Sequence, residues 1–178
     1  ESRTYIPLFA NNAAVAIERG TMTRDMILRT MKLAELRNPK ETAAHVQRVG
    51  AYSAEIYQRW ARNRGLSTKE IKRFKDLLRI AAMLHDVGKV GIPDAILKKS
   101  GPLSKEEFKI MKLHTVYGAR LFFNSNSELD KMCFDIAANH HEKWNGKGYP
   151  KGLAGDAIPL EGRIVAVADV YDALSSDR

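Results

Sequence analysis

The chain has 178 residues and a formal net charge of +8, with 44% hydrophobic and 28% charged residues. This length suits one domain that buries a substantial core and needs no disulfide or metal merely to fold. The single cysteine, Cys133, excludes an internal disulfide framework, and no apolar run is long enough to span a bilayer. Without a secretory signal pattern, we expect a soluble, cytoplasmic protein with no membrane contact by this segment.

The positive charge would suit a polyanionic ligand such as a nucleotide or a nucleic acid. Its densest cluster, at residues 59–79, straddles a helix boundary without a pattern of aromatic residues that would stack bases. A solvated helix surface is the better interpretation. We therefore expect no nucleic-acid binding.

Residues 5–36 are predicted to be mostly helical, because apolar residues such as Phe9, Ala13 and Ala16 recur at helical intervals. Two interpretations stay open: a helix that connects two domains, or an ordinary first helix of the core. Pairing of this helix in two copies would give a homodimer. Pro39 ends the segment, because proline disfavours helical geometry in the residue before it.

The next helix is predicted to begin near Glu41, with Gly65 as its left-handed cap. Its predicted apolar face consists of His45, Val49, Tyr52, Ile56 and Trp60. Residues 67–70 form a capping box, and the helix that follows carries an apolar stripe to His85. Gly88 is expected to end that helix.

A second capping box at residues 104–107 opens a helix with a predicted inner face of Met111, His114, Gly118 and Leu121. The next apolar stripe, residues 129–137, leads to His140 and His141. Residues 145–155 hold four glycines and one proline, which indicates a loop. The last helix follows Pro159, with Asp169 near the edge of an apolar side made of Leu160, Ile164, Val167, Ala168 and Tyr171. No strand pattern is found, so we predict an all-α bundle.

All five histidines lie at inward positions or at the ends of apolar stripes, as expected for ligands of one buried site. With three carboxylates, the candidate metal ligands are Glu41, His45, His85, Asp86, His114, His140, His141 and Asp169. Taken alone, a single inward histidine is more often structural, and Glu41 could be a helix N-terminal charge. Together, their burial without a metal would cost on the order of several kcal/mol for each charged group.

This set is too large for one tetrahedral zinc and predicts two metal ions, or three. Imidazole and carboxylate donors without thiolate allow iron, manganese, zinc, cobalt or nickel, of which iron or manganese is favoured. Two metals about 3.5 to 4 Å apart can hold a bridging hydroxide and stabilise the attacking and leaving oxygens of phosphodiester hydrolysis. Lys89 could reach a phosphate oxygen or assist the leaving group, whereas outside this pattern it would be interpreted as an exposed lysine.

Three motifs, HDVGKVGIPD at 85–94, HH at 140–141 and NGKGYP at 145–150, resemble the HD-GYP family over roughly residues 30–178. The resemblance implies an HD-superfamily helical bundle with a multinuclear metal site in its core. It also implies a phosphodiesterase that hydrolyses the bacterial second messenger cyclic di-GMP to pGpG or GMP, or prefers cyclic GMP-AMP. In it, Asp86 would bridge the metals, Lys89 would be the motif lysine, and Glu41 would match the extra glutamate of three-metal members.

The family's signature loop is matched by Gly146, Gly148, Tyr149 and Pro150, whereas Asn145 stands where the family usually has aspartate. The resemblance implies that this loop is a lid and, in some members, a docking surface for diguanylate cyclase domains of the GGDEF type.

The two ends of the chain carry shorter resemblances. Residues 8–20 resemble the last helix of a GAF-type sensor domain, so residues 1–29 are assigned to a linker helix and 30–178 to the HD-GYP domain. Residues 175–178 resemble the start of the family's SDRPYK stretch, in which Arg178 would contact substrate phosphates. The closing helices of the family's domain are missing from this sequence. Two alternatives therefore remain: a catalytically weak cyclic-dinucleotide receptor or docking module, and a generic HD-type nucleotide phosphohydrolase.

Overall fold

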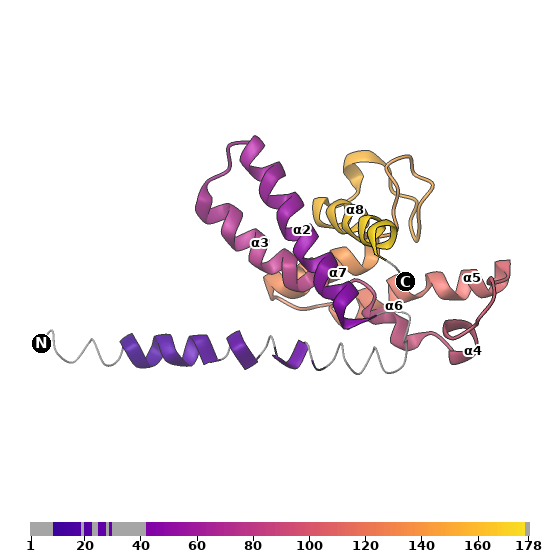
Figure 1. The fold of residues 1–178 in the computed structure, drawn as a ribbon, viewed down its shortest axis with the longest axis horizontal. Coiled ribbons are helices and arrows are strands. Elements are labelled where there is room, and N and C mark those ends of the chain that lie inside the picture. The colour runs from indigo at the N-terminus through magenta and orange to yellow at the C-terminus, as the bar shows by residue number, and fades with distance from the viewer. Residues whose placement is uncertain (1–8, 19, 23–24, 28, 30–41, 177–178) are drawn as a thin grey trace, which may run out of the picture.

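The structure is a computed structural model that describes residues 9–18, 20–22, 25–27, 29 and 42–176. The described residues form no β-sheet, and their strand-like pairing is an isolated bridge between Asn145 and Ala154. The prediction of an all-α bundle is confirmed (Figure 1). The described residues before position 30 are helical, and the later elements are α2 (Ala43–Asn63), α3 (Thr68–Ala82), η1 (Val87–Gly91), α4 (Asp94–Leu97), α5 (Lys105–Lys112), α6 (His114–Leu121), α7 (Glu128–Asn139), η2 (Gly155–Ala157) and α8 (Leu160–Ser175).

The helix ends follow the local signals in the sequence. Gly65 adopts the left-handed conformation, with φ 71°, and closes α2. Ser67 and Ser104 each form a complete capping box with the glutamate three residues later, so both predicted helix starts are confirmed. These signals fix where α3 and α5 begin.

The main core lies where α2, α3, α7 and α8 meet. Val49, Leu78, Ile136 and Val165, one from each helix, are fully or almost fully buried there. Figure 1 shows α2 and α3 side by side as a helical hairpin, with α8 against α2. A smaller cluster around Ile92 joins η1 to α4 and α5. The bundle therefore brings the ends of several helices to one region.

Some of the predicted helix faces are rotated from the buried ones. In α2 the buried face runs through Val49, Ser53, Tyr57 and Ala61, while the aromatic Trp60 lies at its edge. Three residues predicted to face inward are exposed: Leu121, Val167 and Tyr171. Apolar spacing alone does not separate the buried side of a helix from apolar residues on its outer side.

The segment around His85 also differs from the prediction. Helix α3 ends at Ala82, so His85 and Asp86 lie in the turn before η1, and Gly88 lies inside η1 instead of ending α3. A β-carbon on Gly88 would lie 1.9 Å from the carbonyl oxygen of His114. Glycine is needed there because η1 packs backbone to backbone against α6. The helix predicted from residue 104 onward is likewise divided, because α5 ends at Lys112 and α6 begins at His114.

Within the described part of the chain, no helix is both long enough and apolar enough to cross a membrane.

Candidate metal centre

Seven of the eight predicted ligands lie in the described residues, most of them at helix ends. His85 and Asp86 follow α3, His114 begins α6, and His140 and His141 directly follow α7. The remaining two, His45 and Asp169, come from α2 and α8. Glu41 lies outside the described residues.

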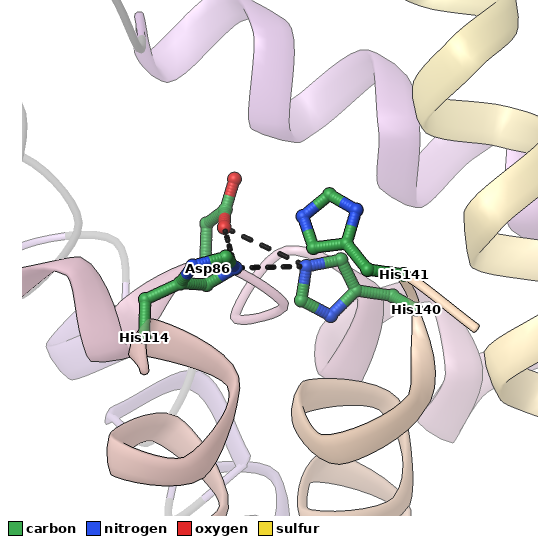
Figure 2. A group of neighbouring side chains, drawn as sticks. All are labelled: Asp86, His114, His140 and His141. Atoms are coloured by element: carbon green, nitrogen blue, oxygen red, sulfur yellow. Dashed lines mark hydrogen bonds and ion pairs between the residues drawn. The ribbon is translucent and has the colours of Figure 1, made fainter. Parts of the chain in front are cut away.

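One group of possible ligand atoms belongs to Asp86, His114, His140 and His141, and these atoms all lie within 4.8 Å of one another. Figure 2 shows the three imidazoles and the carboxylate converging from separate segments. The Nε2 atoms of His114 and His140 lie 3.1 Å and 3.6 Å from Asp86 Oδ1, and 3.4 Å from each other. These distances leave one small space that all the donors face.

A second group consists of His45, His85 and Asp169, again with ligand atoms within 4.8 Å of one another. His45 Nε2 lies 3.5 Å from Asp169 Oδ1, and His85 Nε2 lies 3.1 Å from Asp86 Oδ2. Asp86 therefore directs one oxygen to each group. This is the arrangement that a carboxylate shared by two metal ions requires.

Three of the histidines are held in one tautomer by their own backbone. The Nδ1 atoms of His85, His114 and His140 lie 2.9, 2.7 and 3.0 Å from the carbonyl oxygens of Ala82, Met111 and Ile136. A carbonyl only accepts hydrogen bonds, so Nδ1 carries the proton and Nε2 of the neutral ring carries a lone pair. Those lone pairs face the Asp86 carboxylate, and a cation between them would turn this repulsion into coordination. The residues present thus fit a metal.

Burial keeps the imidazoles neutral and suited to coordination. It lowers the pKa of His140, and it lowers the pKa of His141 to about 2, helped by the neighbouring His140. Burial alone would raise the pKa of Asp86, but the charge of Lys89 and the surrounding histidines lower it well below its usual value. Lys89 Nζ donates to Asp86 Oδ2 at 2.7 Å. The centre therefore combines an ionised carboxylate with neutral nitrogen donors.

The loop with the NGKGYP sequence lies beside these ligands. The Tyr149 ring stacks on His141, with centroids 4.7 Å apart and an interplanar angle of 29°. Gly148 approaches the backbone so closely that a β-carbon would lie 2.4 Å from Lys143 N, and Gly146 has φ 74°. Pro150 follows Tyr149 through a cis peptide bond. The loop is thus built against the histidine pair.

Asn145 can replace the usual aspartate in one respect. Its side-chain oxygen accepts a hydrogen bond from Lys147 N at 3.0 Å, as a carboxylate oxygen would. The turn at the start of the loop therefore needs an acceptor at this position and no charge.

Three residues that support the site were not predicted from the sequence. Arg48 and Asp172 bind each other, and Asp172 also accepts a hydrogen bond from His45. Glu142 is buried and accepts from the backbone N–H groups of residues 151, 152 and 153, at 2.7, 3.1 and 2.9 Å. One signal was available, since Arg48 and Asp172 each lie three residues after a candidate ligand, on the same helix face.

Replacing Glu142 with glutamine is expected to loosen the loop. The amide NH₂ would face a backbone N–H that now has an acceptor, which costs about 1–3 kcal/mol of folding free energy. Hydrogen exchange should quicken at the amides of residues 151–153. The exposed Glu106→Gln serves as the control, and equal exchange in both variants would contradict the anchoring role of Glu142.

Comparisons with known proteins agree with this geometry. An HD domain family model matches residues 26–178. The chain is 42% identical over 173 residues to the 3'3'-cGAMP-specific phosphodiesterase 2 of Vibrio cholerae, covering 97% of this chain and 31% of that protein. It is 47% identical over 146 residues to a cyclic di-GMP phosphodiesterase of Thermotoga maritima, covering 82% of this chain and 37% of that protein. A cyclic di-GMP phosphodiesterase of Vibrio cholerae is 45% identical over 162 residues, with coverage of 88% and 33%.

The chain belongs to the HD domain family. Its motifs and relatives place it among the HD-GYP members, which confirms the resemblance found in the sequence. The chain spans about a third of the length of these curated relatives. The likeness of residues 8–20 to a GAF helix and the domain boundary at residue 30 stay predictions.

Proposed function

We propose that this chain is the hydrolytic domain of a metal-dependent phosphodiesterase that cleaves cyclic di-GMP to pGpG or GMP. The observation that carries the proposal is Asp86, whose two oxygens face two separate groups of imidazole and carboxylate donors. The relatives that share most of this chain are named for hydrolysis of cyclic dinucleotides, which supports the substrate class.

In this proposal, each donor group holds one ion and Asp86 contributes to both. Mixed nitrogen and oxygen donors favour iron or manganese, with zinc, cobalt or nickel also compatible. Such a pair of ions, when bound, supplies positive charge at the attacking and leaving oxygens of a phosphodiester. Glu41 would complete a third site, beyond the described residues.

The surrounding side chains would bind and orient the substrate. The ammonium group of Lys89, partly exposed and next to Asp86, would donate to a phosphate oxygen and balance its charge. Tyr149, stacked on His141, forms a wall beside the centre and keeps water from that side of the imidazole. Arg178, outside the described residues, would contact a substrate phosphate.

The direct test is elemental analysis of protein purified without oxygen, together with hydrolysis assays on cyclic di-GMP and cyclic GMP-AMP. We expect about two or more transition-metal ions per chain. A chelator should abolish hydrolysis, and adding back manganese or iron should restore it. Absence of transition metal in the purified protein would overturn the proposal, and ligand binding without any product would point to a receptor instead.

Cyclic GMP-AMP is a second candidate substrate, because the relative that aligns over 97% of this chain is specific for it. The ratio of kcat/KM for the two dinucleotides decides between them. Hydrolysis of mononucleotides in preference to either would support a generic HD-type phosphohydrolase.

Two protein contacts are also proposed. The loop at residues 145–150 would dock GGDEF-type domains, and the adjacent Trp144, 64% exposed, offers apolar surface for such a partner. The N-terminal helical residues would pair two copies of the chain, since Phe9, Ile17 and Met26 are all more than half exposed.

A further inference from the structure

A buried ion-pair cluster lies next to the His45 side of the centre. The Asp172 side chain, on α8, is completely buried. It accepts from His45 Nδ1 at 2.7 Å and from Arg48 at 2.5 Å (Nε) and 3.0 Å (Nη2). Arg48 holds both carboxylate oxygens, so the plane of the carboxylate is fixed while one oxygen remains directed at the imidazole.

His45 lies between two carboxylates, one on each ring nitrogen. Asp172 Oδ2 lies 2.7 Å from Nδ1, whereas Asp169 Oδ1 lies 3.5 Å from Nε2. The neutral ring has a single N–H, and the shorter contact holds it. Nε2 therefore presents its lone pair to the space shared with Asp169 and His85.

His45 differs in this respect from the histidines held by their own backbone. His85, His114 and His140 each use a carbonyl three or four residues earlier. His45 lies in the first turn of α2, and its partner is a carboxylate 127 residues away in the sequence. A carboxylate on the far nitrogen also makes the imidazole a stronger donor to a cation than a carbonyl does.

We propose that Asp172, held by Arg48, is a positioning residue that selects the His45 tautomer in which Nε2 can bind a metal ion. The inference rests on the proposed metal centre. A mere structural link between α2 and α8 would need only the Arg48–Asp172 pair, whereas the proposed role depends on the contact between Asp172 and His45.

The first test needs no metal and no variant. Nitrogen-15 NMR of the metal-free protein at mildly alkaline pH reports which nitrogen of each histidine carries the proton. We expect His45 to be protonated on Nδ1 and unprotonated on Nε2. Protonation of Nε2 in this protein would overturn the inference, whatever the protein hydrolyses.

The second test compares Asp172→Leu with Arg48→Met, since both remove the ion pair between α2 and α8. In Asp172→Leu the remaining acceptor is Asp169, so the His45 proton should move to Nε2. Manganese(II) titration should then show one ion bound about 10- to 100-fold more weakly. Arg48→Met leaves Asp172 in contact with His45 and should keep both the tautomer and the number of ions bound.

Equal weakening of manganese binding in the two variants would assign Asp172 a structural role and overturn the inference. Adding Asp172→Leu to His45→Ala should weaken manganese binding no further, because the two residues act on the same ion. An additional loss in the double variant would also count against the inference. If the unaltered protein binds no manganese, the proposed function fails, while the tautomer measurement still decides the role of Asp172.

Discussion

Replacing Asp86 with alanine is expected to abolish hydrolysis of cyclic dinucleotides and to reduce the metal content of the purified protein. The carboxylate lies 3.1 Å from the Nε2 atoms of both His85 and His114, one on each of its oxygens. Its removal takes a ligand from both donor groups at once. Loss of one preorganised electrostatic contact costs an enzyme about a hundred- to a thousandfold in rate, so loss of a shared ligand should exceed this range.

Asp86→Asn makes the test sharper. An amide retains one oxygen that can coordinate, but its NH₂ group cannot, so one donor group should keep its ion while the other loses affinity. We expect partial metal content with hydrolysis still below detection. The same elemental analysis on Glu41→Ala should show the loss of one ion at most.

The matched control is Asp94→Ala, which alters an aspartate of the same HDVGKVGIPD segment. Asp94 forms an exposed pair with Lys98 at 2.8 Å, and such pairs contribute little to stability. Metal content and kcat/KM should stay unchanged. An Asp86→Ala protein that retains its full metal content would contradict the shared-ligand role.

The histidines could be found from the sequence because each one ends or interrupts an apolar helical stripe. That local pattern is enough to place His45, His85, His114, His140 and His141 in one core. It does not separate them into two groups. The division depends on how the ends of α3 and α7 and the start of α6 meet, which is a property of packing and not of local spacing.

The supporting residues could not be assigned for the same reason. Asp172 acts on His45 across 127 residues, and only the packing of α8 against α2 brings them together. Glu142 serves amides 9 to 11 residues later, after a loop that has no hydrophobic period. Isolated acidic residues of this kind look like surface charges until the fold shows what they bind.

Gly88→Ala is expected to be among the most destabilising single substitutions in this chain. The added β-carbon would lie 1.9 Å from His114 O and 2.3 Å from Gly118 N, and both of these are backbone atoms. No side chain can rotate away, so η1 and α6 must separate. Gly118 is itself confined, because a β-carbon there would lie 3.2 Å from that of Ala137. We expect a loss of at least about 3 kcal/mol in the free energy of unfolding, at the upper end of overpacking effects.

The same separation would also disrupt the metal centre, because Gly88 lies two residues after Asp86 and its contact is the backbone of His114. Urea unfolding followed by circular dichroism measures the first effect, and metal content of the folded fraction measures the second. Gly101→Ala is the control, because a β-carbon there meets nothing within 4 Å, and its stability should change by no more than about 1 kcal/mol. If the two variants unfold at the same urea concentration, η1 cannot pack backbone to backbone on α6, and the placement of Asp86 beside His114 loses its structural basis.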